Sequence, residues 1–297
     1  MTRRFRRRLN QGRKALLLGL LAASLLSVPS LAQVRTPQAS GTTVFSNGSA
    51  VIDASNASQG YVMVKYSGGT SRIKVRISKR TEYTYDLNTA GNYEVFPLTE
   101  GSGTYTIKVF QQVQGTSYAQ VMSQTVTANI ADSQSPFLYP NQFCNFNANS
   151  AVVAKAAELT GGIADPLAKV QAVYRYAIDH ISYDYQKAAS VQSGYLPVPD
   201  ATLASGKGIC FDYAAVMTSM LRSQDIPTKL VIGYTGGTYH AWVSVYLSGQ
   251  GWVDNIIYFD GTNWRYMDPT FASSGKGDAS VSNYISNQAN YQAKFTY

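Results

Sequence analysis

The chain has 297 residues, 45% of them hydrophobic, which is long enough for one large domain or two ordinary ones. Its formal net charge of +8 would suit a partner such as nucleic acid or a membrane surface. Seven of the 25 basic residues, however, lie in the first 32 positions, where there is no acid, and the other 18 face 17 acidic residues. The charge therefore belongs to the N-terminal segment, and we expect no nucleic-acid partner.

The N-terminal segment has the three parts of a secretory signal peptide. An Arg-rich start precedes an apolar run over residues 15–26, and residues 30–32 read Ser-Leu-Ala, a small-x-small cleavage site. The alternative is an uncleaved anchor, but the run is shorter than the roughly 20 residues that span hydrocarbon. We therefore predict a signal peptide over residues 1–32, cleaved after Ala32, a secreted or extracytoplasmic protein, and no stable membrane anchor.

The rest of the chain has only two cysteines, Cys144 and Cys210, and two histidines, His180 and His240. This number of cysteines cannot form the disulfide framework of a small secreted domain. The spacing of the four residues also fits no common zinc site. We expect neither a metal nor another cofactor.

Residues 33–48 are rich in Pro, Thr, Ser and Gly and are expected to be a flexible lead-in. Over residues 49–131 apolar and polar residues alternate in six or so short runs, which turn signals separate. This pattern is typical of a small all-β sandwich. Cations at Arg72, Lys74 and Arg76 share one face of a predicted strand. They indicate either a solvated face that discourages edge pairing or a contact with an anionic cell-wall or surface polymer.

Residues 132–149 mix Pro, Asn and Ser with aromatics and are predicted to be a linker, and residues 150–297 to be a second domain. Asn149 or Ser150 can cap a helix that reaches Leu159. Asp165 followed by proline predicts a second helix, to about residue 179. A short extended segment over residues 181–185 and a loop rich in Ser, Gly and Pro follow.

Cys210 follows the loop signal Gly-Lys-Gly at residues 206–208, and helical spacing of apolar residues begins just after it. Cys210 is therefore expected at a helix N-terminus, whose partial positive charge favours the nucleophilic thiolate. The alternative is a small buried core residue, which is the usual fate of a free cysteine. Asp212 points about 200° away on the same helix, so we interpret it as a dipole partner rather than a catalytic group.

Two predicted strands, residues 228–235 and 239–247, are joined by Gly-Gly-Thr and form a hairpin that carries His240. A third predicted strand, residues 263–268, ends on Asp268 before a proline. If the strands pair with matching faces, the Asp268 carboxylate can reach the His240 imidazole and fix its tautomer.

Other residues could act as the base or as the acid that orients it. His180 is the only other possible base, but it lies at a predicted helix end, where a histidine is commonly a dipole partner. Asp254 and Asp260 are the rival acids, although Asp260 precedes a glycine and is foremost a turn signal.

The strings GKGICFDYA, LRSQDIPTKLVIGY, YHAWVSVY and WRYMDPT, in this order, resemble the transglutaminase-like superfamily over roughly residues 151–274. The resemblance implies an α+β papain-like core, in which a helix that carries cysteine packs on an antiparallel sheet. By position it implies Cys210 as nucleophile, His240 as general base and acid, and Asp268 as the orienting group. Ser244 stands where the family usually has an acid after HAW, and residues 254–262 are an insertion.

The mechanism that the resemblance implies is acyl transfer from a peptide or protein amide through a thioester. The Cys210 N–H is a plausible oxyanion donor, and Tyr195 or Trp242 are candidates for a second donor, although both are typical packing residues. A cysteine peptidase or amidase, with water as acceptor, is favoured. The alternatives are a cross-linking transamidase and a non-catalytic surface-binding protein that uses the fold as a scaffold. Cys144 is expected to be a buried structural thiol, and a disulfide with Cys210 is a further hypothesis.

Overall fold

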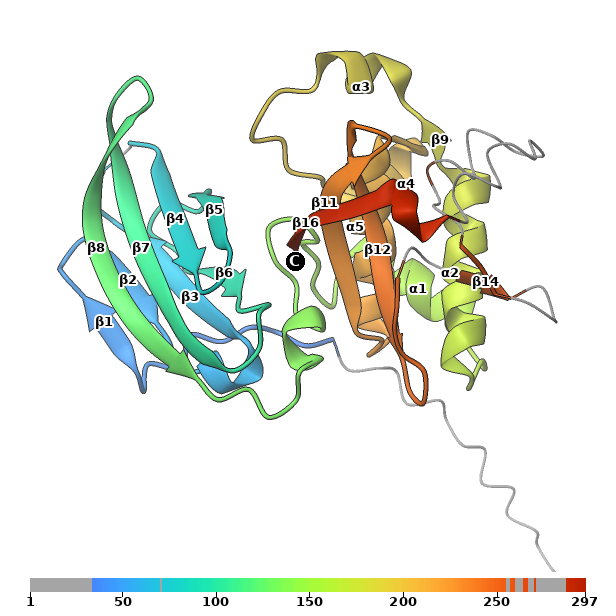
Figure 1. Ribbon diagram of the computed structural model, residues 1–297, viewed down its shortest axis with the longest axis horizontal. Coiled ribbons are helices and arrows are strands. Elements are labelled where there is room, and N and C mark those ends of the chain that lie inside the picture. Colours follow the sequence, from blue (N-terminus) through green and yellow to red (C-terminus); the bar gives the residue numbers. More distant parts are fainter. Residues whose placement is uncertain (1–33, 70, 255–256, 260–263, 267–269, 271–286) are drawn as a thin grey trace, which may run out of the picture. The chain divides into compact units, whose positions relative to one another are not determined.

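The computed structural model describes residues 34–69, 71–254, 257–259, 264–266, 270 and 287–297 (Figure 1). The predicted signal peptide, Asp260 and Asp268 lie outside these residues. In the described ranges no helix has both the length and the apolar character that crossing a membrane requires.

The N-terminal region is rich in β-structure, as the sequence predicts. Its elements are β1 (Val44–Ser46), β2 (Ala50–Asp53), η1 (Ala57–Gln59), β3 (Tyr61–Tyr66), β4 (Ile73–Ser78), β5 (Glu82–Leu87), β6 (Glu94–Pro97), β7 (Gly103–Gln114) and β8 (Ser117–Ala128). They form two four-stranded antiparallel sheets, in the orders β1-β2-β3-β6 and β5-β4-β7-β8. Buried residues of both sheets belong to one hydrophobic cluster, and strands such as β4 and β5 alternate buried with more exposed residues.

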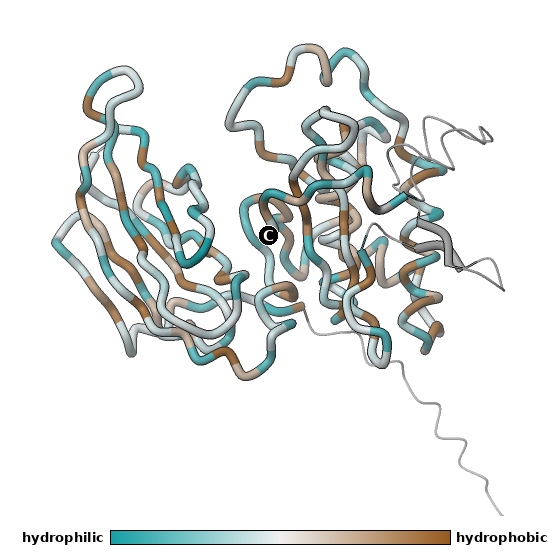
Figure 2. Tube along the Cα trace, in the orientation of Figure 1, coloured by the Kyte–Doolittle hydropathy of each residue, from teal (hydrophilic) through white to brown (hydrophobic). Residues whose placement is uncertain are grey.

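Strand β4 shows how this alternation is used (Figure 2). Its aliphatic residues are buried, and its cations face the acids of the neighbouring strand β5. The Lys74 Nζ lies 2.7 Å from Asp86, and the Arg76 guanidinium 3.3 Å from Glu82. The cationic stripe is therefore matched by cross-strand ion pairs, which supports its interpretation as a solvated sheet face.

The C-terminal region begins with η2 (Ser135–Phe137) and then has five helices in the described residues: α1 (Ala151–Thr160), α2 (Pro166–His180), α3 (Tyr185–Ser190), α4 (Pro199–Ser205) and α5 (Cys210–Ser223). The predicted starts of α1 and α2 are confirmed. Ser150 is the N-cap of α1, and the Asp165 carboxylate accepts hydrogen bonds from two backbone N–H groups in the first turn of α2.

The sheet of this region has the order β13-β12-β11-β16, all antiparallel. It consists of β11 (Thr228–Thr235), β12 (Thr238–Leu247), β13 (Gly251–Val253) and β16 (Tyr291–Thr296), the last preceded by η3 (Gln288–Asn290). The predicted hairpin of β11 and β12 is confirmed, and α5 packs against both strands (Figure 1). The observed α+β architecture, a helix that begins with cysteine on an antiparallel sheet, is the predicted one.

Strand β16 joins this sheet from a distant part of the sequence, and Gly233 provides the space for it. The pairing of β11 with β16 changes register between Ile232 and Gly233. A Cβ atom at Gly233 would lie 2.0 Å from the carbonyl oxygen of Gln292 and 2.8 Å from the Trp242 ring. Glycine at this position therefore permits the close approach of two backbones.

In the described residues the third strand does not pair with the His240 strand, which is the condition under which Asp268 is expected to reach the imidazole. Strand β15 (Trp264–Tyr266) pairs with β14 (Ile257–Phe259) in a separate two-stranded sheet. The Val245–Leu247 part of the edge of β12 is occupied by β13, which follows directly after a tight turn. Consecutive strands joined by a short turn pair readily, since closing the loop costs little entropy.

Arg222 lies in the last turn of α5 and is almost completely buried. Its guanidinium donates hydrogen bonds to the carbonyl oxygens of Thr228 (2.9 Å), Tyr139 (2.5 Å) and Tyr297 (2.7 Å), and contacts the Cys144 sulfur at 3.2 Å. One side chain thus fastens the linker, the start of β11 and the backbone after β16 to the central helix.

We expect Arg222→Met to lower the free energy of unfolding by about 3 kcal/mol or more, because it leaves buried carbonyl oxygens without donors. Chemical denaturation measures this loss. The control is Arg72→Met, whose exposed side chain forms only a loose ion pair, and its effect is expected within about 0.5 kcal/mol. Equal stability of the two variants would contradict the role assigned to Arg222.

Candidate active site

Cys210 is the first residue of α5, as predicted, and its side chain is partly exposed. The residue before it, Ile209, is the N-cap and has no polar side-chain atom. The backbone N–H groups of Asp212 and Tyr213 both bond to the Ile209 carbonyl oxygen. The N–H groups of Cys210 and Phe211 are among the first of the helix, which have no intrahelical acceptor. An anion at Cys210 therefore meets backbone donors and the positive end of the helix dipole.

The backbone before Cys210 is held by a short parallel pair, β9 (Ser182–Tyr183) with β10 (Lys207–Gly208). Two backbone hydrogen bonds extend this pairing. The Ser182 N–H donates to the Gly206 carbonyl (2.8 Å), and the Asp184 N–H donates to the Gly208 carbonyl (2.9 Å). A Cβ atom at Gly208 would lie 2.6 Å from the Cβ of Asp212. Gly208 is thus required because the helix side chains pack directly on the backbone that precedes Cys210.

His240 lies on β12, opposite Gly233 of β11, and its side chain is buried. Its ring stacks near the Trp242 indole, with centroids 6.2 Å apart. Trp242 is itself buried and packs edge-on against Tyr291 at 5.3 Å, which is the packing role expected of it.

Two tyrosines, Tyr183 and Tyr239, interact electrostatically with Cys210. The pKa of Tyr183, on β9, is raised by burial and then by the negative charge of the Cys210 thiolate. The pKa of Tyr239, next to His240, is raised by burial, by Tyr234 and again by Cys210. Both tyrosines are therefore close enough to Cys210 to interact electrostatically with it. Helix α5, which begins with Cys210, packs against β12, the strand that carries His240.

Asp268, the third predicted site residue, lies outside the described residues, so the triad of Cys210, His240 and Asp268 stays a prediction. The rivals can be placed in part. His180 is the exposed last residue of α2, where its Nδ1 lies 3.1 Å from the Tyr176 carbonyl and its ring stacks on Tyr176. Asp254 is exposed just after β13.

Cys144 is a fully buried thiol, and both cysteines are free in the structure. Burial raises the pKa of the Cys144 thiol, although the nearby Arg222 guanidinium acts in the opposite direction. This keeps Cys144 protonated and unreactive at neutral pH. The two thiols of the chain thus lie in contrasting environments: Cys144 is buried, and Cys210 is partly exposed at the N-terminus of a helix.

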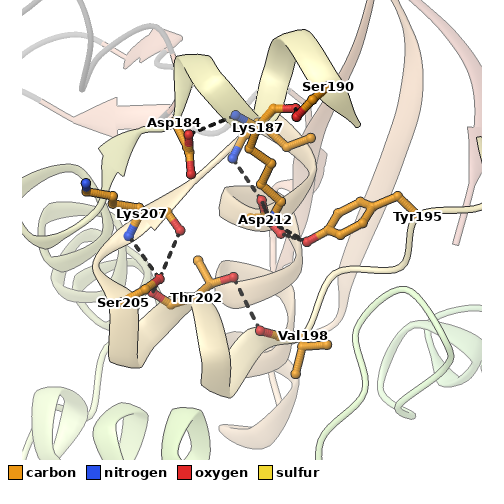
Figure 3. Close-up of polar contacts among 10 residues, drawn as sticks. Asp184, Lys187, Ser190, Tyr195, Val198, Thr202, Ser205, Lys207 and Asp212 are labelled. Atoms are coloured by element: carbon orange, nitrogen blue, oxygen red, sulfur yellow. Dashed lines mark hydrogen bonds and ion pairs between the residues drawn. The ribbon is translucent and has the colours of Figure 1, made fainter. Parts of the chain in front are cut away.

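Asp212 has a larger role than that of a dipole partner (Figure 3). Its side chain is fully buried, and its Oδ2 accepts hydrogen bonds from the Ile209 N–H (2.8 Å) and the Lys187 Nζ (2.7 Å). Its Oδ1 accepts one from the Tyr195 hydroxyl (2.5 Å), which in turn accepts one from Lys187 (2.5 Å). We call Lys187, Tyr195 and Asp212 the Asp212 network.

The Asp212 network corrects one sequence-based candidate. The Tyr195 hydroxyl donates to Asp212, so its proton is not directed at an oxyanion. Burial and then the hydrogen bond to Asp212 raise the pKa of Tyr195 to about 12. Burial tends to lower the pKa of Lys187, but its hydrogen bonds to Asp212 and Tyr195 outweigh this and raise it. At neutral pH Lys187 is therefore an ammonium and Tyr195 a neutral phenol.

The raised pKa of Tyr195 predicts a pH-dependent contribution to stability. A group with a pKa raised in the folded state stabilises the protein fully below its unfolded-state pKa, here about 10, and the contribution is lost as pH rises towards about 12. The stability advantage of the wild type over Tyr195→Phe should therefore shrink between pH 10 and about 12. Urea denaturation at pH 8, 10 and 11.5 measures it, and an unchanged difference would contradict the prediction.

Comparisons with known proteins agree with this architecture. Residues 153–269 match the sequence model of the transglutaminase-like superfamily. The chain is 25% identical to the uncharacterized protein YebA of Bacillus subtilis over 237 residues, covering 73% of this chain and 29% of that protein. It is 31% identical to a protein-glutamine gamma-glutamyltransferase of Pseudomonas aeruginosa over 120 residues, covering 35% of this chain and 18% of that protein.

The chain thus spans less than a third of the length of these two curated relatives. Among solved structures, the periplasmic domain of TgpA from Pseudomonas aeruginosa aligns with a TM-score of 0.37 at 16% identity, covering 82% of this chain and 99% of that chain. The matched sequence includes the helix that begins with Cys210 and the hairpin that carries His240. By its sequence, the segment of residues 153–269 is a transglutaminase-like core domain.

Proposed function

We propose that this chain is a thiol enzyme that transfers acyl groups from peptide or protein amides, with Cys210 as the nucleophile. The observation that carries the proposal is the position of Cys210 at the start of α5, behind an apolar N-cap that leaves backbone donors available. Such donors stabilise both a thiolate and the oxyanion of an acyl-transfer intermediate. The buried Cys144, which has no such surroundings, serves as an internal contrast.

In the proposed reaction the Cys210 sulfur attacks the amide carbonyl carbon, and the oxygen takes up the negative charge beside the Cys210 N–H. His240, which has taken up the proton of the Cys210 thiol, gives it to the departing nitrogen, so that the C–N bond breaks and a thioester remains. A water molecule that loses a proton to His240 then attacks the thioester, and the acid and the free thiol are released. Asp268 holds the His240 ring in the required tautomer.

Hydrolysis is the reaction that we favour, so the product is a cleaved peptide or a deamidated side chain. Transamidation is the second candidate, because a relative that is 31% identical over 120 residues is named a protein-glutamine gamma-glutamyltransferase. In that reaction a primary amine replaces the water. The Arg-rich, apolar and small-residue parts of residues 1–32 support the proposal that the enzyme acts outside the cytoplasm.

We expect Cys210→Ala to reduce amide turnover to the background rate and His240→Gln to reduce it about 10²- to 10⁴-fold. His180→Gln is the matched control, because it alters the chain's other histidine, which is exposed at a helix end. Asp268→Asn and Asp254→Asn form a second matched pair, of which only the first should lose activity. Full activity of Cys210→Ala would sink the proposal.

One incubation separates the acceptors. A glutamine-rich protein is mixed with the enzyme and a labelled primary amine, and peptide cleavage, free ammonia and amine incorporation are measured together. Cleavage or ammonia without incorporation indicates hydrolysis, and incorporation indicates transamidation. If none of the three appears and Cys210 reacts with iodoacetamide no faster than an unfolded-chain cysteine, the fold serves as a scaffold without catalysis.

A further inference from the structure

The first turn of α5 contains two groups that can be negative at neutral pH. Cys210 is its first residue, and the Asp212 carboxylate lies two residues further, with no exposed surface. Both use the same positive helix end, and like charges close together disfavour one another. An uncompensated carboxylate here would therefore oppose formation of the Cys210 thiolate. The structure supplies a compensating cation from another element.

That cation is Lys187, on the short helix α3. Its Nζ lies 2.7 Å from Asp212 Oδ2, and its side chain is only 29% exposed. Lys187 reaches this position because the segment between β9 and β10 is closed at its base by their parallel pairing. The Asp184 carboxylate also accepts a hydrogen bond from the Lys187 backbone N–H (2.9 Å) at the start of α3. Asp212 thus accepts hydrogen bonds from the Lys187 ammonium, the Tyr195 hydroxyl and the Ile209 N–H, and Lys187 also donates to Tyr195 (Figure 3).

We propose that Lys187 is a positioning residue for Cys210, which neutralises Asp212 so that the thiolate is the only net negative charge in the first turn of α5. The inference rests on the proposed function of Cys210. Asp212 is retained because its hydrogen bond to the Ile209 N–H fixes the backbone immediately before the nucleophile. Lys187 removes the electrostatic cost of that carboxylate, and Tyr195 completes its hydrogen bonds.

The titratable and charged groups near the start of α5 come from several elements. They include Asp212 of α5, Lys187 of α3, Asp184, Tyr195, Tyr183 of β9, Lys207 of β10, and Tyr239 and His240 of β12. The tyrosines stay neutral below pH 9, because their pKa values are raised. His240 belongs to the only residue type in this set, besides the thiol itself, whose ordinary pKa lies between 5 and 9. Variants at Lys187 and Asp212 therefore change a fixed charge without adding a titration in this range.

The test is the rate of iodoacetamide alkylation at Cys210 between pH 5 and 9, followed by mass spectrometry of the Cys210 peptide from the full chain. Lys187→Met should move the midpoint of the pH profile up by about half to one pH unit, since Asp212 is then uncompensated. Asp212→Asn should move it down, because the lysine remains without the carboxylate. The double variant should return close to the wild-type midpoint, and Lys187→Arg should stay there.

A purely structural role predicts a different pattern. Both single variants would then react more slowly or more rapidly at all pH values with an unchanged midpoint, and the double variant would depart further from the wild type. That result would overturn the inference. If Lys187→Met does not fold, as judged by circular dichroism, Asp212→Asn still decides, because only the electrostatic account predicts its downward shift. A wild-type profile without any midpoint, in contrast, would contradict the proposed function of Cys210 itself.

Discussion

The start of an α-helix leaves backbone N–H groups without acceptors within the helix. The proposed site in the C-terminal region depends on whether a capping side chain binds these groups at the start of α5. Most helices satisfy these groups with a polar N-cap, which contributes about 1 kcal/mol. Here Ile209 occupies that position, and Asp212 binds the N–H before the helix rather than those within it. Stability is supplied instead by the packing of α5 on β11 and β12 and by Arg222 at its other end. The helix can therefore keep donors available beside Cys210.

The two ends of α5 use charge in complementary ways. At its C-terminal end, where the dipole favours a cation, the buried Arg222 guanidinium binds carbonyl oxygens of segments outside the helix. At its N-terminal end a buried carboxylate is balanced by an ammonium from another helix. Buried charges of this kind seldom add much net stability, but they fix geometry because misplacing either partner is costly. Helix α5 is thus held in place by Arg222 at its C-terminal end, while the ion pair of Asp212 and Lys187 sets the charge at its N-terminal end.

Local signals in the sequence were sufficient for much of the fold and for part of the site. Asp165 followed by proline located the start of α2, and the Gly-Gly turn located the hairpin of β11 and β12. The glycines before Cys210 and the apolar spacing after it located the start of α5. In each case the determining interactions lie within a few residues of one another, where backbone preferences act directly.

Features that depend on distant contacts were not predictable in this way. The pairing of β16 with β11 joins residues about 60 positions apart, and Tyr291–Thr296 has no signal of its own that names this partner. Lys187 lies in a segment that reads as a polar loop, and its pairing with Asp212 follows only from the closure of β9 on β10. The alternation of the third strand does not specify its partner either, and in the structure β15 pairs with β14 while β13 takes the Val245–Leu247 part of β12.

The late arrival of β16 has a consequence for biosynthesis. Ribosomes deliver the chain from the N-terminus, so β11 and β12 emerge when the strand that lies on the other side of β11 has not yet been made. Until then, backbone groups of Val231 to Thr235 form an open sheet edge, which invites pairing with other chains. The edge of β11 is thus open to pairing with other chains from its synthesis until β16 is made.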